Sequence, residues 1–294
     1  MRVTQQMIFN FLISRLQKNQ EQLYKIEDHL ASGKRINRPS DDPVAAARIN
    51  KLRGQLDKVN QYMKNIEEGT KITSAAETAL DDIKDQLSRA QEIVMQQLGG
   101  IQDQQALQAA ASEIDQIRQQ VLQQANVKEE GKFLFAGFAS TTAPFDEDGN
   151  YVGRSGDEFD IEIGEGDYLQ INFCGDELMI TPDGTNIIKL LADLRDHMLS
   201  GDRDWLRNNL SVLEQSLNHI TNKISEVGAR QNRLDSAKSA QDALNYNITV
   251  IISDLEDLDM TEAASQYAAQ KNVLDATMAS AANYLDQSFL DFLK

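Results

Sequence analysis

One apolar pattern constrains the fold of this chain more than any other feature. From Pro43 to about Leu98, apolar residues recur in steps of three and four with few interruptions, which predicts a single helix of about 80 Å at roughly 1.5 Å per residue. A helix this long exceeds the usual globular range and implies a helical bundle or rod. The predicted seam is Ile49, Leu52, Leu56, Val59, Met63, Ile66, Thr73, Leu80, Ile83, Leu87, Ala90 and Val94.

The two ends of the chain carry similar but shorter stripes. Residues 1–38 hold seven Lys and Arg and three Asp and Glu, whereas residues 254–294 hold two Lys and eight acids. Amphipathic helices of opposite charge predict a paired stalk, although independently solvated faces explain the charges as well. The expected assembly seam comprises Phe9, Leu12, Leu16, Leu23, Ile26 and Leu30 at one end, and Leu274, Met278, Ala281, Leu285 and Phe292 at the other.

The remaining helices are predicted from similar spacing and from their caps. Gly99-Gly100 ends the long helix, and a third helix returns through residues 107–121. Helix resumes at about Asn186, a long helix capped by Asp202 continues through Ile248, and the last helix follows residues 257–259. The first helix should stop at Ser32-Gly33, and Asp42 before Pro43 should cap the long helix.

The spacing of apolar residues changes from helix-like to strand-like between residues 133 and 180. Phe159 to Ile163 and Leu169 to Phe173 alternate as strands do, with glycine-containing turns between them. Residues 145–184 hold 12 Asp and Glu and one Arg, so this β-rich insertion is strongly acidic. We expect it to be solvated, and residues 140–183 to be replaceable by a linker. The fold class is therefore mainly α, a long helical rod or coiled-coil bundle of N- and C-terminal segments with a small β-rich insertion.

Composition excludes several functions. A formal net charge of −17 argues against nucleic acid and against anionic membranes, which attract Lys and Arg. No stretch is long enough for a membrane helix, and no secretory signal is recognisable, so composition alone predicts a soluble, cytosolic protein. Cys174 is the single cysteine, expected as a small core or surface residue, which leaves no thiolate metal site.

Candidate catalytic and metal-binding groups are sparse. The three histidines, His29, His197 and His219, have no partner at metal-ligand spacing. The Asp146 to Asn150 run lacks the ligand spacing of a calcium loop and predicts a hairpin turn. Neither a catalytic site nor a metal or cofactor is expected, and the chain is predicted to be no enzyme.

Three motifs resemble a known family. Residues 30–37, Leu-Ala-Ser-Gly-Lys-Arg-Ile-Asn, followed by Asp41-Asp42, resemble the helix–loop–helix corner near the N-terminus of bacterial flagellins and their relatives. Residues 38–43 and 133–145 are similar to the hook-associated proteins that join hook to filament, more than to flagellins themselves. Residues 286–293 resemble the family's closing helix. The corner motif comprises Ser32, Gly33, Arg35, Ile36, Asn37, Asp41, Asp42 and Pro43.

The resemblance implies a subunit of three layers. Residues 1–40 with 255–294 would form an inner domain of paired terminal helices, residues 41–136 with 185–254 a helical bundle, and residues 137–184 an acidic outer domain. The implied function is a structural adaptor joining hook to filament. A flagellin-type filament subunit and a cytosolic coiled-coil scaffold are the alternatives.

The resemblance also implies partners and a location. The partners would be other copies in a ring, the first hook-associated protein on the hook side, flagellin, and a cytosolic export chaperone. Export through the flagellar type III apparatus without a cleaved signal would replace the cytosolic expectation with an extracellular one.

Overall fold

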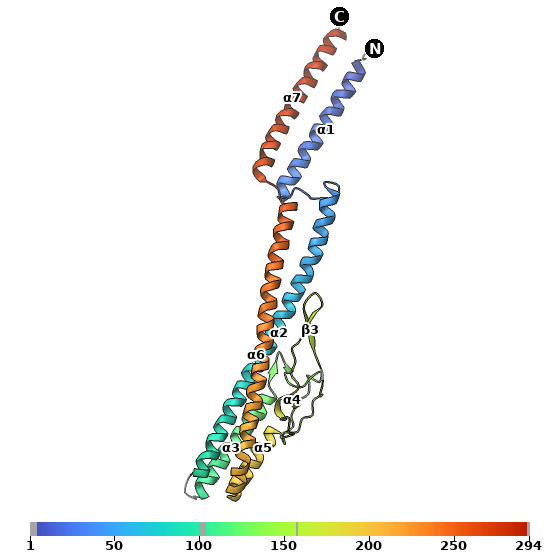
Figure 1. The fold of residues 1–294 in the computed structure, drawn as a ribbon. Coiled ribbons are helices and arrows are strands. Elements are labelled where there is room, and N and C mark those ends of the chain that lie inside the picture. Colours follow the sequence, from blue (N-terminus) through green and yellow to red (C-terminus); the bar gives the residue numbers. More distant parts are fainter. Residues whose placement is uncertain (1–4, 100–103, 157, 293–294) are drawn as a thin grey trace. The chain divides into compact units, whose positions relative to one another are not determined.

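The computed structural model describes the backbone of residues 5–99, 104–156 and 158–292, and the side chains of residues 7–99, 104–156 and 158–283. The described part is mainly helical with two small antiparallel sheets, which confirms the predicted fold class (Figure 1). Its long helices are α1 (Gln5–Ser32), α2 (Pro43–Gly99), α3 (Gln104–Ala125), α5 (Ile187–Ser200), α6 (Arg203–Glu256) and α7 (Met260–Phe292).

The chain divides into two compact units. A terminal unit comprises residues 1–58 and 244–294, and a central unit comprises residues 59–243. Helices α2 and α6 each contribute residues to both units. The terminal unit therefore draws its members from the two ends of the sequence.

Side-chain caps begin the helices where the sequence predicts them. The Asp42 carboxylate accepts hydrogen bonds from the backbone N–H groups of Val44 and Ala45 at 3.1 and 3.0 Å. Asn186 caps α5, and the Asp202 carboxylate accepts from the N–H of Trp205 in the first turn of α6 at 3.1 Å. These bonds satisfy N–H groups that have no partner within the helix, so the predicted starts are confirmed.

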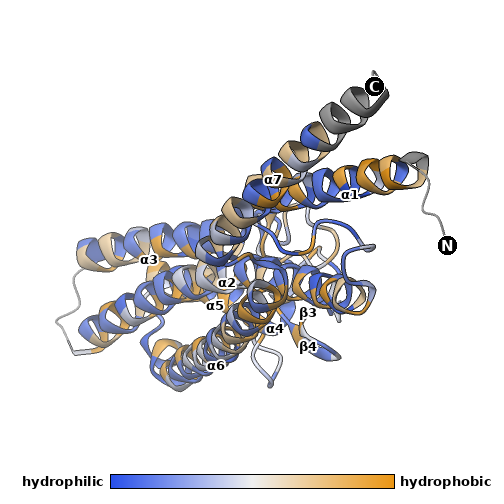
Figure 2. Cartoon of the chain, turned by 90° about the horizontal axis from the view of Figure 1, so that it is seen from above, coloured by the Kyte–Doolittle hydropathy of each residue, from blue (hydrophilic) through white to orange (hydrophobic). Residues whose placement is uncertain are grey.

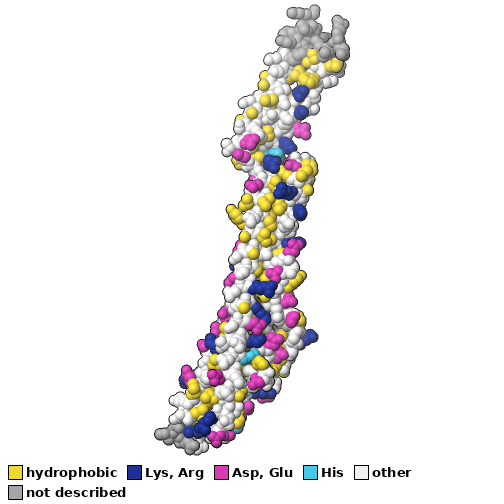
Figure 3. Space-filling view, in the orientation of Figure 1, with side chains coloured by type: hydrophobic (Ala, Val, Ile, Leu, Met, Phe, Trp, Pro, Cys, Tyr) yellow, Lys and Arg dark blue, Asp and Glu magenta, His cyan; other side chains and the backbone are white. Residues whose placement is uncertain are grey.

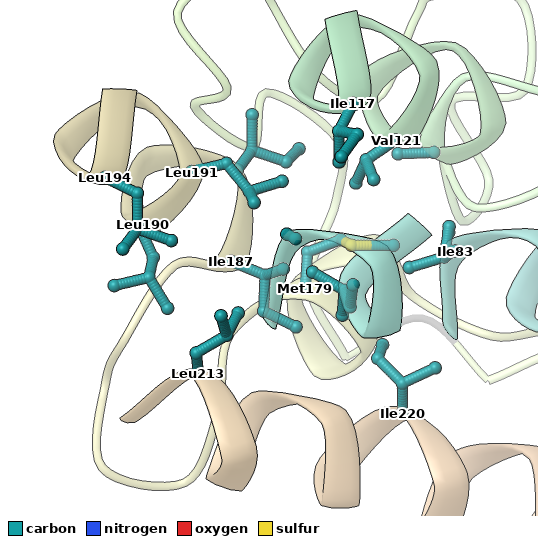
Figure 4. Close-up of a cluster of buried hydrophobic side chains, with 14 of the residues drawn as sticks. Ile83, Ile117, Val121, Met179, Ile187, Leu190, Leu191, Leu194, Leu213 and Ile220 are labelled. Atoms are coloured by element: carbon teal, nitrogen blue, oxygen red, sulfur yellow. The ribbon is translucent and has the colours of Figure 1, made fainter. Parts of the chain in front are cut away.

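One large hydrophobic cluster forms the core of the central unit. It gathers side chains from α2, α3, α5 and α6 and from the short helix α4 (Gly175–Met179). Figure 4 shows these side chains converging between the helices, in keeping with the seams expected for the long helices. Labelled members are Ile83, Ile117, Val121, Met179, Ile187, Leu190, Leu191, Leu194, Leu213 and Ile220.

The insertion contains less strand than the sequence predicts. Strands β1 (Lys128–Glu129) and β2 (Lys132–Phe133) form one hairpin, and β3 (Asp160–Gly164) and β4 (Asp167–Gln170) form another. The second expected strand, Leu169 to Phe173, ends at Gln170. The Ile171 N–H still donates to the Phe159 carbonyl at 3.0 Å, but the Gln170 and Asn172 carbonyls accept from Arg230 of α6 at 3.2 and 3.0 Å. These two carbonyls therefore bond a side chain. The short helix α4 (Gly175–Met179) follows, in a region where the sequence alternates between apolar and polar residues as strands do.

The insertion also takes part in the core. Phe145, Phe173, Leu178 and Met179 are buried within the large cluster. A second cluster joins Ile163 and Leu169 of the hairpin to side chains of α2 and α6. Replacing residues 140–183 by a linker would therefore expose much of the core, which contradicts the expectation that the insertion is dispensable.

Two local predictions within the insertion are confirmed. Asp146 to Asn150 form a hairpin turn, in which the Asp146 carboxylate accepts from the Asn150 N–H at 2.7 Å and Phe145 pairs with Tyr151. Cys174 is a buried core residue, with an exposed fraction of 3%. The acidic residues from Asp146 to Asp148 thus form part of a turn.

We predict that Leu178→Ala destabilises the protein although Leu178 lies inside the acidic insertion. Its side chain is fully buried in the large cluster, and such truncations typically cost about 2–5 kcal/mol. The free energy of unfolding from urea denaturation checks this. Phe138→Ala is the matched control, because that ring is 56% exposed and its loss should cost much less. Equal stability of the Leu178→Ala variant and the unaltered protein would show that the insertion is separate from the core.

Candidate assembly interface

Helices α1 and α7 pack against each other within the terminal unit (Figure 1). The predicted seam residues differ in burial. Leu23 is buried, whereas Leu12, Leu16, Ile26, Leu30, Leu274 and Ala281 are half-buried. Phe9 is 39% and Met278 44% exposed. The side chains of Leu285 and Phe292 lie outside the described residues.

Polar bonds also cross the α1–α7 contact. Asn19, which takes a seam position on α1, donates from Nδ2 to Oγ1 of Thr277 at 2.9 Å. The Gln270 amide donates to the Asn19 carbonyl, and the Tyr267 hydroxyl donates to Glu27, both at 3.2 Å. A polar residue in an apolar seam favours one register over others, because a shift leaves it without a partner. These bonds therefore fix the alignment of α1 along α7.

The pair leaves much apolar surface exposed. An apolar groove lies between the two helices, lined by Phe9, Leu12, Ile13, Leu16, Met278, Ala281 and Ala282. In Figure 2 the half of α1 nearer the N-terminus is largely hydrophobic, and Figure 3 shows hydrophobic side chains at the surface beside the grey residues. Met7 and Phe11 are 60% and 55% exposed. Contiguous exposed apolar surface of this kind marks an interaction site.

The corner between α1 and α2 is built as the motif predicts at three positions. Gly33 has φ of +69°, the left-handed conformation that closes a helix, and its N–H donates to the His29 carbonyl at 2.9 Å. Asp42 caps α2, and Pro43 is its first residue. Ile36 is buried in a small cluster with Ala45, Ala46 and Ile49. The loop is thus held at both ends and in the middle.

Asp41 is the electrostatic centre of this corner. Its carboxylate accepts from the Arg38 and Asn37 N–H groups at 3.0 and 3.2 Å, and lies 3.0 Å from the Lys25 ammonium. The Arg38 N–H bond and the Lys25 side chain together lower the pKa of Asp41 to about 2. Sequence analysis assigned Asp41 only to the corner motif, and the structure shows that it joins α1 to the loop.

A buried carboxylate, Glu256, ties this corner to the end of α6. It is 5% exposed, and its carboxylate bonds Lys34 at 2.6 Å and Arg53 at 2.7 Å. Arg35 donates from its N–H to the Glu256 carbonyl at 2.7 Å and from its guanidinium to the Leu255 carbonyl at 2.8 Å. The α1–α2 loop is thereby fastened to α6, so the two ends of the sequence meet here.

Sequence reasoning missed Glu256, Lys34 and Arg53 as a group. One signal was available, because a carboxylate on the last residue of a helix lies at the negative end of the helix dipole and needs cationic partners. Which cations would supply them cannot be deduced from spacing, since Lys34 and Arg53 lie more than 200 residues away in sequence.

The histidines have ordinary structural surroundings. His29 lies 3.9 Å from Asp41, the His197 ring stacks on Trp205 with centroids 4.0 Å apart, and His219 contacts the Glu177 carbonyl at 3.0 Å. Within the described ranges, no three His, Cys, Asp or Glu residues gather in a way that could hold a metal ion. No helix among these residues has the length and apolar character needed to cross a membrane.

Two regions of one family match the chain. The region described as bacterial flagellin N-terminal helical region matches residues 3–140, and the bacterial flagellin C-terminal helical region matches residues 210–293. The matched residues include α1, α7 and the whole corner, and exclude most of the acidic insertion.

Individual relatives match nearly the full chain. Flagellar hook-associated protein 3 of Escherichia coli K12 is 27% identical, covering 94% of this chain and 95% of that protein. Flagellin of Bacillus subtilis 168 is also 27% identical, covering 96% of each. The crystal structure of Bacillus cereus FlgL is 28% identical, with a TM-score of 0.61 over 69% of this chain and 99% of that one.

We predict that Asp41→Asn destabilises the protein at pH 7 by about 1–2 kcal/mol, and that the difference closes towards pH 2. The pKa of Asp41 is lowered to about 2 in the fold, against about 3.9 for an unfolded aspartate. The carboxylate therefore stabilises the fold above pH 3.9, and this contribution is lost as the pH falls through about 2.

Urea denaturation of the Asp41→Asn variant and the unaltered protein at pH 7, 4, 3 and 2 measures this difference. Asp28→Asn is the control, because Asp28 is 53% exposed and lies 3.9 Å from Arg38, so its loss should change stability by less than about 0.5 kcal/mol. A difference at pH 7 that persists unchanged at pH 2 would contradict the assignment.

Proposed function

Because the chain belongs to the bacterial flagellin family, we propose that it is a structural subunit of the flagellum that joins the hook to the filament. One observation carries the proposal. The α1–α7 pair, made from the two ends of the sequence, leaves an apolar groove and several large apolar side chains exposed. A subunit with such a surface is stabilised when neighbouring copies cover it.

The proposed assembly seam is the apolar stripe of α1 and α7. On α1 it runs from Phe9 to Leu30, and on α7 from Leu274 to Ala281, with Leu285 and Phe292 as its proposed continuation. Residues 1–40 with 255–294 would form the inner layer, residues 41–136 with 185–254 the bundle, and residues 137–184 the outer layer. In this arrangement the apolar stripe faces other subunits, while the acidic side chains of the insertion lie at the surface of the subunit.

The adaptor role is favoured over a filament role by the relatives and by two motifs. Hook-associated protein 3 of Escherichia coli matches over 94% of the chain, and the FlgL structure of Bacillus cereus has the same fold. Residues 38–43 and 133–137 are similar to those of hook-associated proteins. The equal identity to Bacillus subtilis flagellin keeps a filament subunit as the second candidate. Family membership argues against a cytosolic scaffold.

The partners follow from the proposed place in the flagellum. Other copies would complete a ring, with a hook-side junction protein on one side and flagellin on the other. A chaperone would cover the apolar surface in the cytosol before export, which would proceed without a cleaved signal. The proposed role is structural, and it requires no cofactor.

Immunogold labelling of intact flagella tests the proposal. We expect antibodies against this chain to label one point, where hook meets filament, because a junction subunit matches its own kind only laterally. Cells lacking the chain should build hooks without filaments and release flagellin into the medium. Antibodies against flagellin provide the control and should label the whole filament.

Labelling along the whole filament would overturn the adaptor role in favour of flagellin. Long filaments grown from the purified chain alone would lead to the same conclusion, since heterologous contacts that do not close produce open polymers.

A further inference from the structure

A positively charged cleft lies in the corner of the terminal unit. It has a volume of about 270 Å³ and includes Lys34, Arg38 and Arg53 around an apolar floor of Ile36 and Ile49. Figure 3 shows several Lys and Arg side chains where α1 gives way to α2. The cleft is separate from the apolar groove between α1 and α7 and shares no lining residue with it.

The cations that line the cleft outnumber the carboxylates close to them. Glu256 is the one carboxylate among the lining residues, and the Asp28 carboxylate lies 3.9 Å from Arg38 outside the lining. Both bonds from Arg53 to Glu256 come from Nη2, although a guanidinium has five N–H donors. The side chains of Lys34, Arg53 and Arg38 remain 44%, 49% and 74% exposed. The cleft therefore presents cationic donors to the surface after Glu256 is satisfied.

The sequence around the cleft is basic in a strongly acidic chain. Residues 34–58 hold seven Lys and Arg and three Asp, whereas the whole chain has a net charge of −17. Two of those three acids, Asp41 and Asp42, accept backbone N–H bonds within the corner. A partner that fits this surface must supply negative charge, and carboxylates are the anionic groups that a protein chain provides.

The chain itself contains such a segment. Residues 145–184 hold 12 Asp and Glu and one Arg, and Asp148, Glu158 and Asp160 are exposed. We propose that the corner cleft of one copy binds carboxylates of the acidic insertion of a second copy. The proposal rests on the proposed function, in which copies lie beside one another. It joins two different surfaces, so it is a heterologous contact that sets the direction of assembly.

The contact between cleft and insertion would align neighbouring copies more than it would strengthen their binding. Exposed ion pairs contribute little free energy, while complementary charge orients partners and disfavours wrong alignments. The apolar seam supplies most of the affinity, and opposite charge selects which surfaces meet. The contact should weaken with salt, because charges are screened over about 8 Å at physiological ionic strength.

Carbodiimide cross-linking of the full chain tests the proposal. The reagent activates a carboxylate, and the Lys34 ammonium, once deprotonated, forms an amide with it as the activating group leaves. Equal amounts of ¹⁴N- and ¹⁵N-labelled protein are mixed at high concentration and low salt, and the peptides are analysed by mass spectrometry. We expect mixed-label peptides that join Lys34 of the cleft to acids of residues 145–184.

Charge reversal identifies the pairing surfaces. Arg38→Glu should reduce the yield of these peptides about fivefold, the upper end for one exposed ion pair. Mixing it with an Asp160→Lys variant should restore part of the yield. Arg207→Glu is the control, since Arg207 is 65% exposed outside the cleft and its change should leave the yield unaltered. The Arg38→Glu variant keeps the corner, because Asp41 bonds the backbone N–H of residue 38.

Two results would overturn the proposal. One is the absence of mixed-label peptides between the cleft and residues 145–184, whether or not copies are linked elsewhere. The other is an equal loss of yield in the Arg38→Glu and Arg207→Glu variants. Neither depends on the place of the protein in the flagellum, which immunogold labelling reports separately.

Discussion

The structure depends on one constraint: a pair of helices can bury only the stripe along which they touch. In the α1–α7 pair Leu23 is buried, while Phe9 and Met278 keep 39% and 44% of their surface exposed. In the central unit, several helices and the insertion together cover the apolar stripes and enclose one hydrophobic cluster. Within the described residues of the terminal unit, the α1–α7 pair keeps an apolar groove exposed. We infer that neighbouring subunits complete its core, and the adaptor role follows from that need.

Charged interactions in the corner hold the end of α1 that adjoins the α1–α2 loop. Asp41 joins α1 to the corner loop, and Glu256 of α6 pairs with Lys34 of the loop and with Arg53 of α2. Buried charges are weak sources of stability, but they penalise any arrangement that leaves them unpaired. The corner therefore positions α1, and the apolar seam of α1 and α7 supplies the affinity between subunits. The cationic cleft beside Glu256 extends the same use of charge to a contact between copies.

Local features of the fold could be predicted from the sequence, and contacts between distant segments could not. Seam spacing and caps such as Asp42 and Asp202 locate the helices because these signals act within a few residues. The strand predicted to reach Phe173 ends at Gln170, and the carbonyls of Gln170 and Asn172 bond Arg230, which lies some 60 residues away in α6. Glu256 was missed for a similar reason, since its partners are distant in sequence. The burial of Leu178 inside an acidic insertion likewise depends on tertiary packing.

Amide hydrogen exchange of the dilute monomer tests the central claim most directly. Isolated helices with one narrow apolar stripe are marginal in water, and ordering them costs roughly 1–2 kcal/mol per residue of backbone entropy. We predict rapid exchange within minutes for residues 7–32 and 260–283, beside slow exchange for residues 76–94 of the central core. Sedimentation of the same sample establishes that it is monomeric. Slow exchange of both terminal helices in that monomer, equal to that of the core, would contradict the claim that neighbours are needed to complete them.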